Sequence, residues 1–310
     1  MSIREVFSSA TVTLDHRPYH VRTWRGGFVA AAEQGSATVL SGALEILDRV
    51  ELGDDLVDVA LADDGASWAW ISGGELRIGS PDAPRSAAVT GEGACRWRSP
   101  ARDLWFAASS GPEVAVEVWT GSAVHRALVP DPFGDSGTLL FDHPASDSMV
   151  LWIAAGRDGA RSWLVSFDGV AVRTERLPCD DRGPALFGPA GDWFLAPGRD
   201  DLVRVSWPGG AVLGRLAWSP VGEHDLGGMD VQLLPGGYAS WSGENGRICV
   251  VDLTTMAVAD EIAIAGRPLG FSVAGADGTL LTVHDENRIE LTRARDWSPE
   301  PDRYAAGSIA

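Results

Sequence analysis

The 310-residue sequence contains no lysine, so all 25 of its basic side chains are arginines. Schiff-base chemistry, attachment of pyridoxal phosphate and the phosphate-binding lysine of a P-loop are therefore excluded. Against 43 acidic side chains, the arginines leave a formal net charge of −18 and a pI near 4.6. Phosphate backbones and anionic lipid headgroups repel such a charge, so we expect neither a nucleic acid nor a membrane as partner.

Cysteines and long apolar runs are also scarce. Cys95, Cys179 and Cys249 form no C-x-x-C pair, so the sequence predicts neither a zinc site nor a disulfide framework, and we expect no metal and no cofactor. It contains no stretch of 18 uncharged apolar residues and no N-x-S/T glycosylation site. These features are typical of a cytoplasmic protein, and 45% hydrophobic residues are enough to form a large core.

One short pattern recurs along the chain. An aromatic or aliphatic residue is followed by a turn, usually with glycine, and then by Ala-Val; the copies begin at Trp119, Phe167 and Trp207, and more loosely at Leu253, with spacings of 48, 40 and 46 residues. Each copy lies between two alternating apolar runs, which predicts two antiparallel strands joined by a tight turn. We expect Gly121, Gly169 and Gly209 to supply a positive φ there.

A second pattern, a Gly/Pro/Asp-rich turn before an apolar strand, occurs seven times and completes a four-stranded unit with each hairpin. The seven units are predicted to begin near Tyr19, Leu56, Cys95, Thr138, Pro184, Asp230 and Pro268. The fold class predicted is all-β, a seven-bladed β-propeller of four-stranded antiparallel blades. Large aromatic side chains fill the space between twisted sheets, so we interpret most of the 13 tryptophans as core residues.

The last unit has only three strands before Trp297, and the alternating run 8–15 has no partner of its own. Pairing 8–15 with 288–293 completes the last blade, so we expect the N-terminal strand to close the ring and remove both sheet edges. The expected organisation is a single propeller over 1–297, with 8–15 completing the last blade, and a loose C-terminal tail over 298–310.

Residues 246–291 resemble the YVTN-type and WD-repeat propellers. The resemblance is carried by the V-V-D-L-T-T turn at 250–255, the G-x-P at 266–268 that opens the next unit, and the D-G at 277–278 before the following strand. It implies the propeller architecture only, because such repeats occur in scaffolds, ligand-binding proteins, lyases and cyclases alike.

The loops after units three, four and five are longer than the others and are expected on one face of the ring. They carry Asp131, Asp135, Asp180, Asp181, Glu223, His224, Asp225 and Asp230, with Arg182 as the only cation. A face of this kind suits a basic partner or a cation. The alternative interpretation is a solvated acidic rim, since loops are polar in any protein.

Histidines near carboxylates are the candidates for chemistry. His224 lies between Glu223 and Asp225, and His284 precedes Asp285 in a turn of unit seven that is expected on the same face. Carboxylates beside an imidazole raise its pKa and orient it as a base, so these five residues are the catalytic candidates. His20, Asp131, Asp181 and Arg182 are the candidates for ligand binding. The alternative for each histidine is an ordinary hydrogen bond to solvent or backbone.

The sequence predicts a cytoplasmic, monomeric and non-catalytic binding or scaffold propeller. It would recognise a basic protein or peptide through its acidic loop-rich face, or a small-molecule ligand in the central funnel. The alternative is a small-molecule biosynthetic enzyme, a lyase, cyclase or isomerase, that uses the histidine and carboxylate candidates as acid and base. A carbohydrate-binding propeller is the third possibility, and it requires exposed tryptophans.

Overall fold

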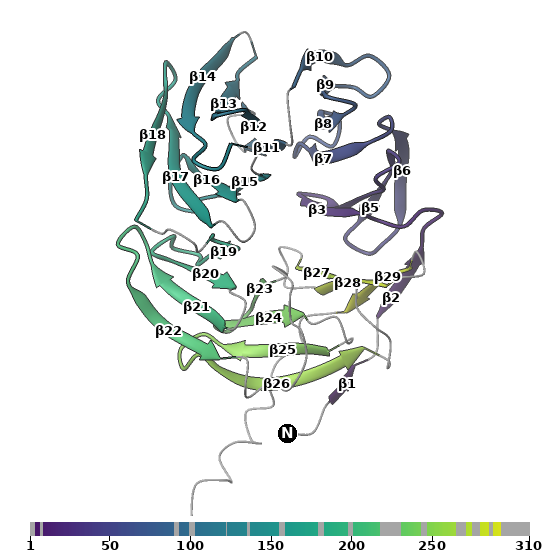
Figure 1. Ribbon diagram of the computed structural model, residues 1–310. Coiled ribbons are helices and arrows are strands. Elements are labelled where there is room, and N and C mark those ends of the chain that lie inside the picture. The colour runs from purple at the N-terminus through teal and green to yellow at the C-terminus, as the bar shows by residue number, and fades with distance from the viewer. Residues whose placement is uncertain are drawn as a thin grey trace, which may run out of the picture.

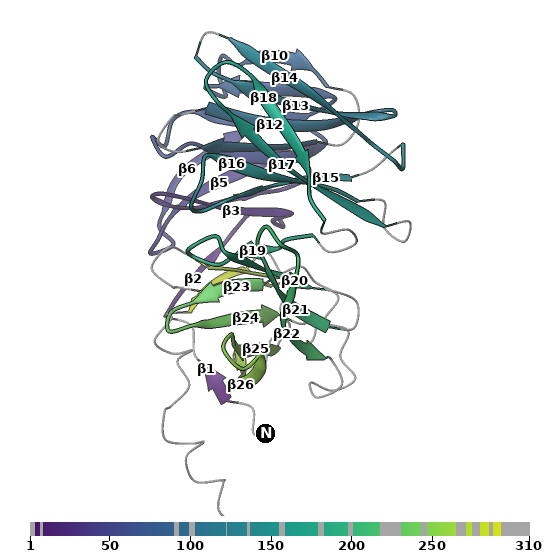
Figure 2. The ribbon, with the colours of Figure 1, turned by 90° about the vertical axis from the view of Figure 1, so that its left-hand side faces the viewer.

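The computed structural model describes residues 4–6, 9–89, 93–98, 103–121, 123–134, 137–154, 159–178, 183–197, 201–217, 231–242, 247–264, 271–274, 280–284 and 288–292. Within these ranges every regular element is a β-strand, and the strands form seven sheets arranged around a common axis (Figure 1). Turned by 90°, the ring is seen edge-on and is flattened along its axis (Figure 2). The described part contains no helix long and apolar enough to cross a membrane.

The first four blades follow one another along the chain, each with its strands in sequence order. Blade one contains β3 (His20–Trp24), β4 (Gly27–Ala31), β5 (Ser36–Ser41) and β6 (Ile46–Glu51). Blade two contains β7 (Leu56–Leu61), β8 (Trp68–Ser72), β9 (Glu75–Gly79) and β10 (Arg85–Ala88). Blade three contains β11 (Gly93–Arg98), β12 (Asp103–Ser110), β13 (Glu113–Trp119) and β14 (Val124–Pro130). Blade four contains β15 (Gly137–Asp142), β16 (Ser148–Ala154), β17 (Ala160–Phe167) and β18 (Val172–Arg176).

The remaining three blades include two strands from the N-terminus. Blade five contains β19 (Leu186–Phe187), β20 (Trp193–Pro197), β21 (Asp201–Ser206) and β22 (Val212–Ala217). Blade six contains β23 (Val231–Leu234), β24 (Tyr238–Ser242), β25 (Arg247–Asp252), β26 (Ala257–Ile264) and β1 (Arg4–Val6). Blade seven contains β27 (Phe271–Ala274), β28 (Leu280–His284), β29 (Arg288–Thr292) and β2 (Ala10–Thr13).

The predicted seven-bladed, all-β fold is confirmed. The first strand of each blade lies nearest the axis, where it contacts the first strands of neighbouring blades, and it begins within three residues of the position expected from the sequence (Figure 1). Each blade is antiparallel throughout its four main strands, as alternation and short turns predicted.

The N-terminal segment extends two blades at their outer edges. β2 pairs antiparallel with β29, with Ala10 opposite Leu291, as the sequence suggested for 8–15 and 288–293. β1 pairs in parallel with β26, with Arg4 opposite Ile262, and adds a fifth strand to blade six (Figure 1). The strand β1 was not predicted from the sequence, because three residues are too few to show a period.

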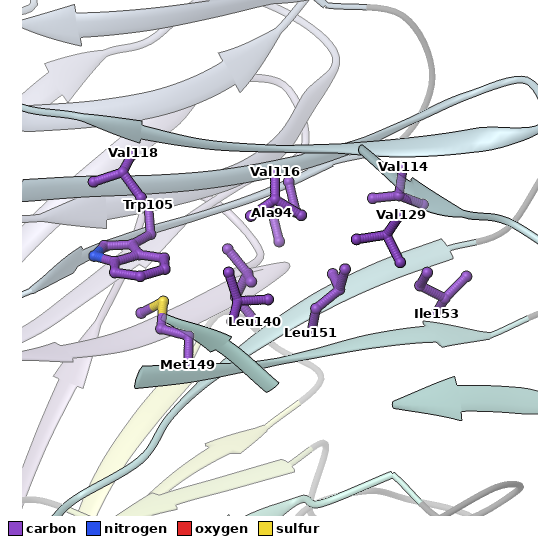
Figure 3. Packing of buried hydrophobic residues seen from close by; sticks show 12 residues of the cluster. Ala94, Trp105, Val114, Val116, Val118, Val129, Leu140, Met149, Leu151 and Ile153 are labelled. Atoms are coloured by element: carbon purple, nitrogen blue, oxygen red, sulfur yellow. The ribbon is translucent and has the colours of Figure 1, made fainter. Parts of the chain in front are cut away.

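The core lies between the faces of adjacent blades, because each sheet buries one side against the next. The run EVAVEVW of β13 shows how: Val114, Val116 and Val118 alternate onto one face and are fully buried against blade four. Their partners include Leu140, Met149, Leu151 and Ile153 (Figure 3). Of the tryptophans, Trp70, Trp105 and Trp241 are among the largest fully buried side chains, as their core interpretation requires.

The expected glycine turns need one correction. Gly169 has a φ of 89°, as predicted, but in the next copy the positive φ of 71° belongs to Gly210 and not to Gly209. Gly121 does not adopt a left-handed conformation. The prediction was wrong at Gly121 and Gly209. The turn at Gly209 is longer than the turn at Gly169, since its closing hydrogen bond joins Ser206 N to the Ala211 carbonyl, whereas the other joins Asp168 N to the Ala171 carbonyl.

Candidate functional site

Most of the candidates named from the sequence lie outside the described residues. This applies to Asp181, Arg182, Glu223, His224, Asp225 and Asp285. The backbone of His284 is described at the end of β28, where it pairs with Arg288 of β29. The roles of these seven residues stay predictions.

Asp131 follows β14 directly and is buried. Its Oδ1 accepts a hydrogen bond from the backbone N–H of Phe133 at 2.9 Å, and its Oδ2 accepts one from Ser109 Oγ at 3.3 Å. Both carboxylate oxygens therefore have donors within the chain, and they tie the loop after blade three to β12.

His20 opens β3 close to the axis, with Tyr19 edge-on to its ring at 4.7 Å between centroids. Its Nε2 is buried and has no hydrogen-bond partner. Burial lowers the pKa of His20 to about 4, because the attraction of Asp58 is offset by repulsion from Arg22 and Arg96. The imidazole is thus neutral at physiological pH.

Beside His20, a buried carboxylate joins three consecutive blades. Asp58 of β7 accepts a hydrogen bond from Arg22 Nη2 of β3 at 3.1 Å and another from Arg96 Nη1 of β11 at 2.7 Å. The backbone N–H of Cys95 donates to the same carboxylate at 3.0 Å. One side chain of blade two therefore holds blades one and three at the inner edge of the ring.

Local backbone structure explains why Asp58 can reach both neighbours. The register between β7 and β8 shifts between Leu56 and Asp58, so that Val57 is an extra residue on β7. A bulge of this kind changes the direction of the following side chain. In addition, an innermost strand has one edge without a ladder partner, so the N–H of Cys95 is available to the carboxylate.

The charges of the cluster stabilise one another. Burial opposes ionisation of Asp58, but Arg96, Arg22 and the Cys95 amide hold the pKa of its carboxyl below its usual range. Burial and the neighbouring Arg96 lower the pKa of Arg22, whereas Asp58 raises the pKa of Arg96 against the effect of burial. Burial and the adjacent Asp58 also raise the pKa of the Cys95 thiol, which makes it a poor nucleophile.

The two arginine side chains are only partly buried, although their charged groups are desolvated. Arg22 keeps 33% of its side-chain surface accessible and Arg96 keeps 20%, while Asp58 keeps only 5%. Such a combination is expected for side chains that face the axis of the ring, where protein surrounds them on several sides.

Two further charged residues, Asp142 and Arg98, lie beside Arg96. Asp142 ends β15, and its desolvated position raises the pKa of its carboxyl despite the nearby Arg96 and Arg98. Arg98 of β11 donates through Nη1 to the carbonyl oxygen of Ser148 at 2.6 Å and through Nη2 to that of Ser146. Arg98 thus fastens blade three to the first turn of blade four.

The other side of the axis differs in character. The inner strands β19, β23 and β27 have the sequences LF, VQLL and FSVA, so none of them carries a charged residue. All charged residues of the described inner strands belong to β3, β7, β11 and β15. Among the described inner strands, charged residues therefore occur on blades one to four and not on blades five to seven.

A serine and a histidine also form a hydrogen bond in the turn between β15 and β16. Ser146 Oγ lies 2.9 Å from Nδ1 of the buried His143, whose Nε2 lies 3.0 Å from the carbonyl oxygen of Gly191. With the proton on Nε2, His143 donates to Gly191 and accepts from Ser146. The pair joins the first turns of blades four and five, so a structural role explains its geometry.

Arg22, Asp58 and Arg96 were not among the residues predicted from the sequence. A signal was present, because an aspartate interrupts the apolar run of β7 and arginines occupy nearly equivalent positions of the neighbouring inner strands. Within the described residues, no three His, Cys, Asp or Glu side chains are grouped so that they could hold a metal ion.

The seven sheets define a seven-bladed β-propeller, with a charged cluster at the inner edge of blades one to three. Three of the solved structures that are similar to this chain are named here, and each covers more than 90% of it. The β-propeller domain of Myceliophthora thermophila Cps50 (Swd1) is 11% identical, with a TM-score of 0.66, and covers 92% of this chain and 98% of its own. Kuenenia stuttgartiensis hydrazine synthase is 13% identical, with a TM-score of 0.66 and coverage of 91% and 97%. The WD40 β-propeller domain of Doa1 is 12% identical, with a TM-score of 0.63 and coverage of 94% and 98%.

These similarities establish the propeller fold. At such low identities they carry no further information on activity. No protein-family model and no curated protein sequence matches this chain.

Proposed function

We propose that this protein is a non-catalytic binding or scaffold propeller that recognises a basic protein or peptide through an acidic, loop-rich face. The face is the one formed by the loops between blades and by the turns between second and third strands. In an antiparallel blade these connections lie at the same end of the strands.

The observation that carries the proposal is an exposed acidic cluster on this face of blades one and two. Glu33 lies in the turn between β4 and β5, Glu51 ends β6, and Asp54 and Asp55 lie in the loop from β6 to β7. The turn and the loop are held together by hydrogen bonds from Leu56 N to the Glu33 carbonyl at 2.8 Å and from Leu52 N to the Gly35 carbonyl at 2.9 Å. We refer to Glu33, Glu51, Asp54 and Asp55 as the acidic cluster.

The proposal extends this surface around the same face to the loops after blades three to five. It includes Asp181 and Arg182, which lie outside the described residues, as ligand-binding residues, and it includes Asp131 through the loop that its buried carboxylate holds in place. The net charge of −18 favours encounter with a basic partner. The WD40 propeller of Doa1 and the propeller of Cps50 support a protein partner, because WD40 propellers generally bind proteins.

A fluorescent nona-arginine peptide tests the proposal by anisotropy titration. The variant E33Q/D54N/D55N should bind it about tenfold more weakly, if each carboxylate contributes about 0.5 kcal/mol. The matched control E45Q/D63N/D82N removes three exposed carboxylates from turns on the opposite face and should bind like the unmodified protein. The affinity should also fall between about 50 and about 300 mM salt. Equal losses in both variants would overturn the proposal.

The similarity to hydrazine synthase favours an alternative, a small-molecule enzyme such as a lyase, cyclase or isomerase. Its acid and base would come from His224 with Glu223 or Asp225, and from His284 with Asp285, with His20 near the axis. For any small-molecule turnover that the protein is found to support, H224A or H284A should then lower kcat by ~100-fold with little effect on stability. Unchanged turnover in both variants would exclude these residues as acid and base.

Localisation and assembly belong to the same proposal. We place the protein in the cytoplasm as a monomer, with one propeller over 1–297 and a loose tail over 298–310. Sedimentation equilibrium tests the monomer, since a concentration-dependent increase in mass would contradict it.

A further inference from the structure

We propose that a pocket between blades two and three binds one aromatic side chain of a protein partner, with Arg85 holding a carboxylate beside the ring. The pocket lies where β9, β11 and β13 end and where β10, β12 and β14 begin. In antiparallel blades this is the end of the strands opposite the acidic cluster. The pocket is therefore a second docking point, separate from the surface of the proposed function.

The pocket is small and has an apolar interior. Its volume is about 210 Å³, and it is lined by the buried Ile78 and Leu104 and by the partly buried Trp97 and Trp119. An engineered cavity of about 150 Å³ in another protein holds one benzene ring, whereas drug-sized ligands occupy pockets of about 300–1,000 Å³. The volume therefore fits one aromatic ring with little else.

The next junction of the ring shows what fills the corresponding space there. His125 of β14 lies opposite the penultimate residue of β13, and its ring packs against Phe167 of blade four at 4.7 Å between centroids. Its Nδ1 lies 2.9 Å from the carbonyl oxygen of Val170. Between blades two and three, Arg85 has the register position of His125, and Trp119 ends the third strand as Phe167 does. A ring of the chain itself packs at one junction, and the other junction has a pocket of ring size.

Arg85 is an exposed cation at the rim of this pocket. Among the described residues its guanidinium group has no ion pair and no hydrogen bond. Asp82 lies three residues before it and does not pair with it. Glu117 accepts a hydrogen bond from Trp119 Nε1 at 2.9 Å and lies 3.8 Å from Arg126 Nε. Arg85 is thus available to a carboxylate of the partner, which favours an aromatic residue with an acidic neighbour.

The surface beside the pocket favours a protein partner over a free small molecule. Burial of one ring supports only about millimolar affinity by itself, so a specific occupant must contact more surface. Val124 at the rim and Leu128 further along β14 are each 48% exposed. Because side chains alternate along a strand, both project on the same side of β14. A peptide segment with its ring in the pocket could cover both residues.

The dipeptide N-acetyl-Phe-Asp amide is a suitable probe, because it carries one ring and one carboxylate. In an NMR titration of the full chain it should shift the indole N–H signals of Trp97 and Trp119 until they saturate. N-acetyl-Ala-Asp amide lacks the ring and should bind at least about tenfold more weakly. N-acetyl-Phe-Asn amide lacks only the charge and should bind about two- to fivefold more weakly.

Two pairs of matched variants, all at exposed positions, locate the site. R85Q should abolish the difference between the Phe-Asp and Phe-Asn peptides. R173Q changes the corresponding position of blade four, opposite the penultimate residue of β17, and should keep that difference. V124D places a carboxylate at the rim and should weaken binding of the Phe-Asp peptide by at least about fivefold. V212D changes the first residue of β22, which is 54% exposed, and should bind the peptide like the unmodified protein.

The proposal is overturned if the Phe-Asp peptide does not saturate, if the Ala-Asp peptide binds as tightly, or if the two members of either variant pair behave alike. Phenylacetate tests a free aromatic acid as the occupant. Weaker binding of phenylacetate than of the dipeptide supports a protein partner, and tighter binding overturns it. E33Q/D54N/D55N should bind the dipeptide unchanged, because the acidic cluster lies on the opposite face. Failure here is therefore distinguishable from failure of the proposed function.

Discussion

Blades one to three and blades six and seven are reinforced at opposite edges of their sheets. In the first group, Asp58 connects the inner strands β3, β7 and β11 through two arginines and a backbone amide. In the second group, β1 and β2 are added at the outer edges, beside β26 and β29. Both devices supply partners to strand edges that would otherwise lack them.

Unpaired strand edges are therefore satisfied in two ways, by an added strand at the outer edge and by a side-chain carboxylate at the inner edge. An outer edge has room for a whole strand, which satisfies several backbone groups at once. An inner edge near the axis has no such room, so a single carboxylate takes over the unpaired amide of Cys95. The carboxylate at the inner edge places charged side chains near the axis, whereas the strands added at the outer edges do not.

The largest effect should come from removing the N-terminal strands. Deletion of residues 1–16 eliminates β1 and β2, exposes the edges of β26 and β29, and should convert a dispersed protein into an aggregating one. Deletion of 1–8 removes β1 alone and is the control, since β2 still covers β29. Light scattering and thermal unfolding measure both. If residues 1–16 can be deleted without a change in solubility or Tm, the outer strands β1 and β2 contribute nothing to the stability or solubility of the ring.

The next largest effect should follow from D58N. The substitution leaves Arg22 and Arg96 facing each other without a carboxylate, and removing one partner of a buried ion pair typically costs about 3–5 kcal/mol. Urea unfolding measures the loss. The control D15N acts on a carboxylate that is 61% exposed, and it should cost far less. Equal effects would show that burial does not distinguish the two sites.

The stability should depend on pH through His20. Its pKa is about 4 in the folded chain against 6.5 in the unfolded chain, so the unfolded state binds more protons between these values. Stability should therefore fall as the pH falls from about 6.5 to about 4, by up to about 2 kcal/mol from this residue after allowance for its partial exposure. Urea unfolding at about pH 7 and about pH 4.5 should show a smaller loss in H20Q than in the unmodified protein. H125Q, on the outer strand of blade three, is the control. It should lose as much unfolding free energy between the two pH values as the unmodified protein does.

The smallest effect concerns turns at the rim. G169V forces a branched side chain into a φ of 89°, where no atom crowds the new Cβ, so it should cost about 1 kcal/mol from the backbone alone. G121V has the same open surroundings without a left-handed φ and should cost less. Equal losses of unfolding free energy would contradict the turn geometry described here.

The sequence predicted the architecture well because the repeat is local. Alternating runs and turn residues repeat in every unit, and they located the first strand of each blade to within three residues. The shift from Gly209 to Gly210 was not predictable, since similar turn sequences adopt different turn types. The strand β1 also escaped detection, because three residues pairing in parallel with β26 leave no periodic pattern.

The candidate site was much less predictable from the sequence. The candidates at 223–225 and 284–285 were predicted because histidines lie beside carboxylates in loops. The charged cluster lies instead within mostly apolar strands. Its assembly depends on the bulge at Val57, which redirects Asp58, and on the ring geometry that brings β3, β7 and β11 together. Neither is encoded in the spacing of charged residues along the chain.

The central feature of the site is a desolvated charged cluster at the inner edge of blades one to three. The titration of the His20 imidazole, followed by NMR, tests it most directly. We predict that His20 titrates near 4 in the folded protein, because burial and the two arginines outweigh Asp58, and that D58N lowers the pKa further by removing the one favourable charge. A pKa near the ordinary value of 6.5, unchanged in D58N, would contradict the account.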